Sequence, residues 1–310
     1  MDNIFTVTLF ATAITAGTPI LFAALGETLT EKAGVINLGV EGMMLVGAVA
    51  GFMVNAATHS PWMGALAALL AGGCMAFIHA FLTITLRANQ VVSGLALTIF
   101  GQGFSGFLGK SMIGIPAPAS FKTFAIPFLS DIPFIGPIFF RQDALVYLSY
   151  VLVVCFAVII FKTRWGLSLN AVGENPAAAD AVGISIFRTR YLYVILGGML
   201  AGLGGAYLSL AYAPSWLENM TAGRGWIAVA LVVFATWNPL KCLAGSYIFG
   251  GLDALGFRIQ TKGIAISPFF LKMLPYICTI LVMILITRET KNHRVSPPGA
   301  LGLPYDREER

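Results

Sequence analysis

Long apolar stretches alternate with short polar ones along almost the whole chain. A helix needs about 20 apolar residues to cross the hydrocarbon core of a bilayer. On that criterion the pattern predicts about nine spanning helices, at residues 4–26, 42–57, 62–86, 91–109, 143–162, 191–212, 226–237, 242–257 and 270–287. We therefore expect an all-α polytopic membrane protein, with a transmembrane domain over residues 1–290 and a cytoplasmic tail over 291–310.

Two polar interruptions stand out from this pattern. Residues 27–41 contain three acids and one lysine beside glycine-rich apolar sequence, and an Asn-Pro pair at 238–239 divides the apolar run that follows residue 225. Irregular backbone at membrane depth is tolerated only where protein or a wet cavity surrounds it. We expect broken or re-entrant segments near 27–41 and 236–245. For the first segment, an equally good alternative is a cytoplasmic loop, with Asn37 or Glu41 near the N-terminus of span 42–57.

Composition supports a membrane protein and excludes several other classes. Apolar residues make up 57% of the chain and charged ones 11%, against about 25% charged residues in soluble domains. This excludes an ordinary soluble enzyme and a nucleic-acid-binding domain. Placing the C-terminal tail in the cytoplasm puts 12 of the 19 Lys and Arg residues inside, which predicts an external N-terminus. No basic residue precedes the first span, so we expect it to be retained rather than cleaved.

The two longest loops differ in kind. The predicted external loop 110–141 is rich in Pro and Phe, whereas the predicted cytoplasmic loop 163–190 contains an alanine-rich stretch after Pro176. Proline suits the first position of a helix, and alanine favours helix. We expect a short surface helix here, bounded by Gly173 and Gly183.

Motifs for nucleotide, metal or hydrolytic chemistry are not supported. Residues 101–106 match GxGxxG and 104–111 resemble a phosphate-binding loop, but both lie within or at the end of an apolar span. The first motif requires a strand before it and a helix after it. The sequence contains no HExxH and no Cys/His cluster, so we expect no catalytic residues and no metal site. Asp253 is the clearest carboxylate inside an apolar span, and such residues are costly there.

Four segments carry a family resemblance: GVINLGVEGMM at 34–44, RANQVVSGLA at 87–96, AVGENPAAADAVGI at 171–184, and the run from Thr221 to Gly256. In this order and spacing, over about residues 10–290, the chain resembles the permease subunits of bacterial ABC importers for simple sugars, nucleosides and branched-chain amino acids. The form of the first motif, with Asn37 and Glu41, resembles the nucleoside-type branch.

The resemblance implies a permease subunit that is not itself an enzyme and binds no cofactor. ATP would be used by a separate ABC ATPase subunit. The other implied partners are a second permease chain, related or identical, and an extracytoplasmic substrate-binding protein. The implied location is the bacterial inner (plasma) membrane, multi-pass in the lipid bilayer, with no nucleic acid. Simple sugars and branched-chain amino acids are the alternative substrates within the family, and a secondary transporter is the alternative class.

Two sets of residues are candidates for function. Amide, hydroxyl and carboxyl groups are expected along a substrate pathway: Asn37, Glu41, Asn89, Gln90, Ser93 and Gln102. The implied ATPase partner needs a rigid cytoplasmic handle, and the glycine-bounded short helix suits that role: Gly173, Glu174, Asn175, Pro176, Asp180 and Gly183.

Overall fold

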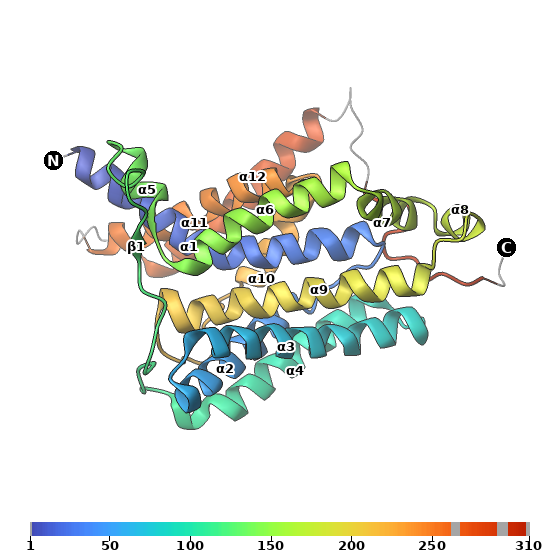
Figure 1. Cartoon of the computed structure of the whole chain (residues 1–310), viewed down its shortest axis with the longest axis horizontal. Coiled ribbons are helices and arrows are strands. Elements are labelled where there is room, and N and C mark those ends of the chain that lie inside the picture. The colour runs from blue at the N-terminus through green and yellow to red at the C-terminus, as the bar shows by residue number, and fades with distance from the viewer. Residues whose placement is uncertain (1, 262–266, 290–296, 308–310) are drawn as a thin grey trace.

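The protein is a bundle of long helices with the N-terminal end and the C-terminal tail at opposite ends of its long axis (Figure 1). The computed structural model describes residues 2–261, 267–289 and 297–307. Its long helices are α1 (Asp2–Lys32), α2 (Val40–Thr58), α3 (Pro61–Ala80), α4 (Gln90–Gly109), α6 (Ala144–Lys162), α9 (Ile186–Tyr207), α11 (Pro239–Thr261) and α12 (Pro268–Glu289). The opposite placement of the ends accords with an external N-terminus and a cytoplasmic tail, which remain predictions.

Shorter elements join the long helices. One-turn π-helical extensions, η1 (Phe81–Thr85) and η3 (Leu208–Tyr212), continue α3 and α9. The other short helices are η2 (Lys110–Met112), α5 (Ile135–Phe139), α7 (Arg164–Glu174), α8 (Pro176–Ala181) and α10 (Arg224–Phe234). In the 110–141 loop, β1 (Phe124–Ala125) pairs antiparallel with β2 (Arg141–Gln142).

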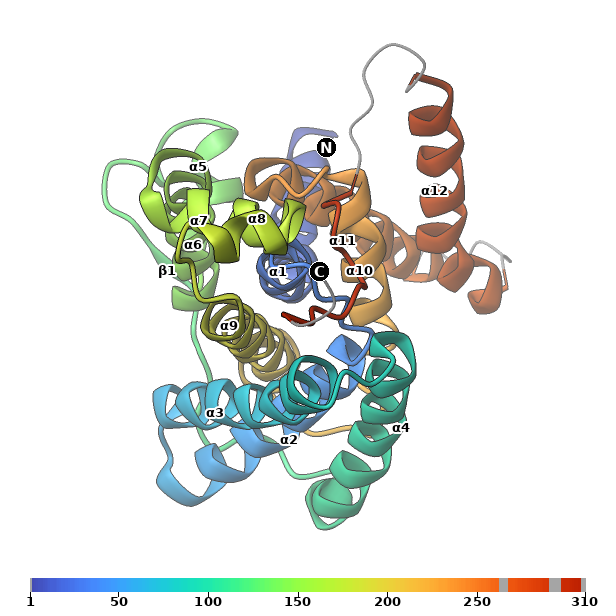
Figure 2. The same cartoon turned by 90° about the vertical axis from the view of Figure 1, so that its right-hand side faces the viewer.

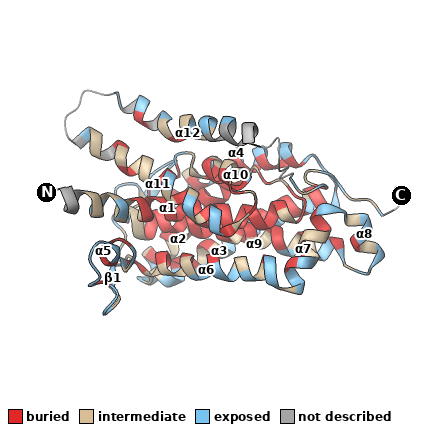
Figure 3. Ribbon diagram, turned by 90° about the horizontal axis from the view of Figure 1, so that it is seen from above, coloured by how far each residue is buried: buried red, intermediate tan, exposed pale blue. Residues whose placement is uncertain are grey.

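The core lies along α1, α2 and α9, where buried residues gather (Figure 3). Glycines let these helices approach backbone to backbone: Gly47 on α2 lies against Gly202 on α9, and Gly26 on α1 lies against Gly197 on α9. In lipid, such close approach supplies the packing energy that the hydrophobic effect supplies in water. Close helix packing therefore explains the glycines at these helix contacts.

The number of spans is lower than the pattern predicts. In the described part of the chain, six helices are long and apolar enough to cross a membrane: α1, α2, α3, α4, α6 and α9, where the spans of α3, α4 and α9 include η1, η2 and η3. The expected count of about nine is not confirmed. Helix α10 has 11 residues, about 16 Å of helix, which covers roughly half of a hydrocarbon core. Helices α11 and α12 have the length but are not among the six.

Both predicted breaks are shorter than expected. Helix α1 continues to Lys32, so the first break is confined to residues 33–39 instead of 27–41. The second lies at residues 235–238, because α11 already begins at Pro239. A proline is accommodated at the start of a helix, where its missing N–H is not needed. Each predicted range overlaps an observed helix interruption but extends into a neighbouring helix, and the re-entrant character of the two segments stays a prediction.

The predicted short helix of the 163–190 loop is present as α8. The Asn175 side chain accepts a hydrogen bond from the Ala178 N–H at 3.0 Å, and Pro176 occupies the first turn. Gly183, just after the helix, has a φ of +86°, which favours glycine. The GxGxxG match lies inside α4, where Gly101 packs against the backbone of Gly42. It is a helix contact and not a nucleotide-binding turn.

Candidate functional site

The non-helical residues 33–39 are mostly buried, and side chains from three helices bind their backbone. Glu27 Oε1 accepts from the Asn37 N–H at 3.1 Å, and Gln90 Oε1 accepts from the Ile36 N–H at 2.7 Å. His79 lies between the Ile36 carbonyl and the Ser93 hydroxyl, 3.0 Å from each. Because buried backbone groups without partners are costly, these contacts explain how an irregular segment is tolerated inside the bundle.

Glu41 links this segment to the half-length helix α10. Its Oε1 accepts from the Thr221 hydroxyl at 2.6 Å and the Gly223 N–H at 2.8 Å, and its Oε2 accepts from the Gly225 N–H at 2.7 Å. A carboxylate at a helix N-terminus binds free N–H groups and interacts favourably with the helix dipole. Glu41 thus caps α10, whereas α2, the helix it was expected to cap, has Gly39 at its N-cap without a side-chain hydrogen bond.

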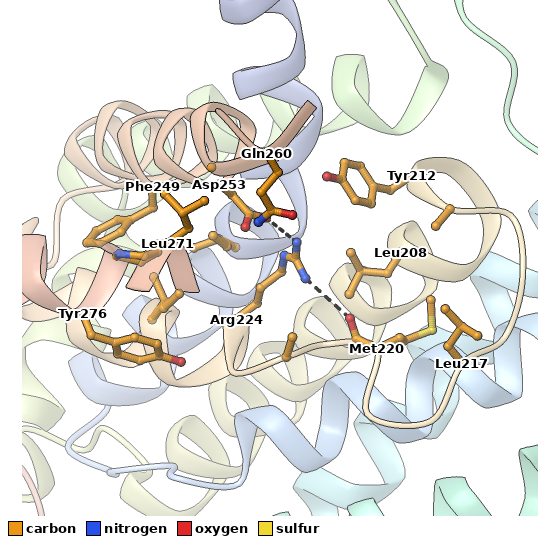
Figure 4. Close-up of a pocket in the computed structure, with 16 residues that line it drawn as sticks. Leu208, Tyr212, Leu217, Met220, Arg224, Phe249, Asp253, Gln260, Leu271 and Tyr276 are labelled. Atoms are coloured by element: carbon orange, nitrogen blue, oxygen red, sulfur yellow. Dashed lines mark hydrogen bonds and ion pairs between the residues drawn. The ribbon is translucent and has the colours of Figure 1, made fainter. Parts of the chain in front are cut away.

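A cavity of about 540 Å³ lies beside the start of α10 (Figure 4). Residues of α1, η3, α10, α11, α12 and the 213–223 loop form its wall. Its lining is mostly apolar, with three aromatic rings and three polar side chains: Tyr212, Phe249, Tyr276, Arg224, Asp253 and Gln260. Apolar walls with a few convergent polar groups are typical of small-molecule sites.

The polar side of the cavity is an ion pair between α10 and α11. Arg224 Nη2 lies 2.5 Å from Asp253 Oδ2, with the two side chains 12% and 33% exposed. Arg224 Nη1 also donates to the Met220 and Thr221 carbonyls at 3.5 and 3.3 Å. The Tyr212 ring centre lies 5.7 Å from the guanidinium carbon. The arginine is therefore held on several sides, and its charge is compensated where water is scarce.

Of this pair, only Asp253 could be singled out from the sequence. Asp253 was conspicuous as a carboxylate within an apolar run, but its partner Arg224 lies 29 residues earlier, in a short polar segment. The signal that could have found Arg224 is the cost of an unpaired carboxylate in a span, which requires a cation nearby. Several basic residues met that description, and the sequence alone does not rank them.

The six expected pathway residues fall into two groups. Asn37, Glu41, Gln90 and Ser93 are buried around the 33–39 segment. Asn89 and Gln102 are exposed. Asn89 lies just before α4 and accepts a hydrogen bond from the Val92 N–H, and Gln102 lies within α4. Among the described residues that line the cavity, none of the six is found. Their role along a path remains a prediction, whereas Glu41 reaches the cavity indirectly by capping α10.

The expected handle residues lie at the opposite end of the molecule from the N-terminus (Figure 1), beside residues 297–307, which we name the tail strap (Figure 2). The Gly173 carbonyl accepts from the Ala300 N–H at 2.8 Å, and Glu174 Oε2 accepts from the Gly299 N–H at 3.2 Å. Asp180 Oδ2 lies 3.0 Å from both the Tyr305 hydroxyl and Arg307 Nε. The handle is therefore tied to the tail strap.

The tail strap also contacts the spanning helices. Buried Arg190, on α9, donates to the carbonyls of Ala33 and Leu303 at 3.1 and 3.2 Å. The Gly302 N–H donates to the Gly34 carbonyl at 3.2 Å, and Asp306 pairs with Arg87. The end of α1, the loop before α4, the handle and α9 are thus connected at one end of the bundle.

Comparisons with known proteins agree with this architecture. Residues 9–288 match the family described as branched-chain amino acid transport system / permease component. A Haloferax volcanii chain provisionally named as the glucose ABC transporter permease protein TsgC13 is 42% identical, covering 98% of this chain and 99% of its own. The nucleoside ABC transporter permease NupC of Lactococcus lactis is 36% identical over 86% and 88%. The guanosine ABC transporter permease NupQ of Bacillus subtilis is 35% identical over 93% and 92%.

A solved structure supports the same fold. It is an ABC transporter, provisionally described as metal-chelate type, in an inward-facing conformation. Its TM-score to this chain is 0.50, at 13% identity, covering 91% of this chain and 85% of its own. At this identity the likeness concerns the fold alone.

These observations define a multi-pass membrane subunit of an ABC importer, a class of subunit that is not itself an enzyme. The chain belongs to the branched-chain amino acid transport system permease family, within the nucleoside and simple-sugar group of its relatives. The sequence-based identification of this family is therefore confirmed.

Proposed function

We propose that this chain is the permease subunit of an ATP-driven importer of nucleosides or related purine and pyrimidine compounds in the bacterial inner membrane. A separate ATPase, a second permease chain and an extracytoplasmic binding protein complete the importer. The names of two relatives support a nucleoside substrate, and that of a third supports glucose. Glucose is therefore the main rival, followed by branched-chain amino acids.

The observation that carries the nucleoside proposal is the composition of the cavity. Its volume, about 540 Å³, is within the range of small-molecule sites, about 300–1,000 Å³. Three aromatic rings offer faces on which a base can stack, while the charges of Arg224 and Asp253 compensate each other. Such a cavity suits a neutral, partly aromatic, hydrogen-bonding solute.

The proposed contact with the ATPase is the handle, residues 173–183, together with the helix α7 that leads into it. Exposed apolar side chains mark this end of the molecule: Leu167 and Val182 are 70% and 76% exposed. Apolar side chains outside the lipid-facing helices are often covered by a partner. The Gly173 and Glu174 contacts with the tail strap hold the handle in place, so movement of a docked ATPase would pass to the spanning helices.

Uptake measurements test the proposed substrate. Cells with and without this chain would be given labelled nucleosides, glucose and leucine. We expect loss of the chain to abolish nucleoside uptake and to leave the other two unchanged. Loss of glucose or leucine uptake alone would contradict the nucleoside assignment.

Copurification tests the proposed class of mechanism. An ABC permease should bring down an ATPase subunit, and its transport should stop when ATP is depleted at a constant proton gradient. A secondary transporter would do neither, since its transport depends on the gradient alone.

A further inference from the structure

We propose that the Arg224–Asp253 pair binds the pairing edge of the nucleobase and favours bases that present a carbonyl oxygen next to an N–H group. Guanine, hypoxanthine and uracil have this lactam edge, whereas adenine and cytosine have a ring nitrogen acceptor beside an amino group. This inference rests on the proposed nucleoside function and assigns the residues that discriminate among nucleosides.

The pair presents a donor beside an acceptor. Arg224 supplies N–H donors in a planar fork, and the Asp253 carboxylate supplies acceptors only. Both residues line the cavity, and Arg224 Nη2 lies 2.5 Å from Asp253 Oδ2, so the pair places a donor and an acceptor within the width of one base edge. A lactam matches both, because its oxygen accepts from the guanidinium while its N–H donates to Asp253. On adenine the corresponding ring nitrogen would place a lone pair against the carboxylate, and this repulsive contact would replace a hydrogen bond.

The aromatic groups are arranged around this polar point. Figure 4 shows the Arg224 side chain reaching toward Asp253 and Gln260, with Phe249 on one side and Tyr212 on the other. Tyr212 already lies 5.7 Å from the guanidinium carbon. A flat base between these rings would bury its faces against apolar surface and direct its edge toward the ion pair. The cavity thus provides stacking and edge recognition together.

The pair is held in position from outside the cavity. The Glu41 carboxylate binds the N–H groups of Gly223 and Gly225, the residues on either side of Arg224. These hydrogen bonds fix the first turn of α10 and hence the backbone position of Arg224. Because the pair has no net charge, it does not attract ions strongly and can release a neutral solute, which a transport path requires.

The test uses the whole importer and two matched solute pairs. Inosine and adenosine differ at the six-position edge, and uridine and cytidine differ in the same sense. Initial uptake rates would be measured at concentrations that saturate the binding protein, so that differences arise at the permease. We expect Asp253→Asn to lower the inosine-to-adenosine and uridine-to-cytidine rate ratios by about tenfold, because a charge-assisted hydrogen bond to the base is lost.

Controls separate recognition from folding. Asp131 and Arg141 form an exposed pair with an N···O distance of 4.0 Å, so Asp131→Asn should leave both ratios unchanged. Asp253→Glu keeps the charge but moves the acceptor by one methylene. It should lower the ratios even if Asp253→Asn fails to reach the membrane in normal amounts.

The outcomes are distinguishable. Equal loss of all four nucleosides in both Asp253 variants, with the ratios unchanged, would show that the pair has a structural role and would overturn this inference. A wild-type importer that moves no nucleoside at all would instead overturn the proposed function. Wild-type ratios near one that do not change in either variant would leave the function intact and refute the edge recognition.

Discussion

At the scale of single residues, Glu41 connects two parts of the chain that are far apart in sequence. It is 4% exposed and accepts three hydrogen bonds from residues 221–225. The sequence indicated that the 34–42 motif was special, because acids are rare beside apolar spans. It could not identify the partner of Glu41, since a carboxylate can cap its own helix or any helix N-terminus packed against it.

Replacing Glu41 with Gln tests this cap. The amide keeps the shape but loses the negative charge, so the N-terminus of α10 should be held less firmly. We expect a loss of about 1.5–3 kcal/mol, the range for hydrogen bonds to a charged group, measured as a lower unfolding temperature of the purified protein. Glu218→Gln is the control, because Glu218 is exposed. Equal unfolding temperatures for the two variants would contradict the capping role.

At the scale of elements, glycine contacts decide how closely helices pack. A Cβ at Gly205, on α9, would lie 2.6 Å from the Met44 carbonyl carbon and 3.0 Å from the Ala48 nitrogen of α2. The small-residue spacing at 198–202 and 47–51 is typical of close helix packing in general. Which glycines meet, and which face open space, depends on the rotation of each helix, which the spacing does not specify.

Alanine substitutions separate these cases. Gly205→Ala should push α2 and α9 apart and cost about 1–3 kcal/mol, as overpacking does. Gly103→Ala on α4 meets nothing within 4 Å and should leave stability unchanged or slightly raised. Thermal unfolding in the same detergent compares the two. A Gly205→Ala variant as stable as the wild type would show that the helices are packed less closely than described.

The handle is the element most directly open to functional tests. Changing Glu174 and Asp180 together to Lys reverses two charges on α7 and α8 and opposes their contacts with the tail strap. We expect the solute moved per ATP to fall at least about fivefold, a modest coupling energy, while ATP hydrolysis by the complex continues. Tyr305→Phe, which removes one of these contacts, is the comparison. Unchanged transport in the double variant would argue against a coupling role for this site.

At the scale of the whole molecule, the apolar runs predict a helical protein that crosses the membrane several times, but they do not give the number of crossings. Runs of hydropathy do not distinguish a full span from α10, which ends after 11 residues. The cavity could likewise not be predicted from the sequence, because its lining residues come from elements far apart in the chain, from Ile20 on α1 to Tyr276 on α12. By contrast, the short helix α8 was predictable, since its cap, proline and glycine are local signals.

Labelling single cysteines tests the orientation. In a background with Cys74, Cys155, Cys242 and Cys278 replaced, an impermeant maleimide added to intact cells should label Ala125→Cys. It should label Val182→Cys only after the membrane is opened, because we expect the handle to lie in the cytoplasm. Both positions are exposed, so access depends on the side of the membrane. Labelling in the reverse pattern would invert the proposed topology.

The tail strap has a consequence for how this protein is made. Residues 297–307 leave the ribosome after every spanning helix, yet they bind the backbone near Gly34 and Gly173 and the side chain of Arg190. The contacts at the C-terminal end of α1 are therefore completed only when translation has passed α12. A frameshift or stop codon just after α12 would keep all the long helices but leave Arg190 and the handle without these partners, so truncated chains would expose this end to proteases.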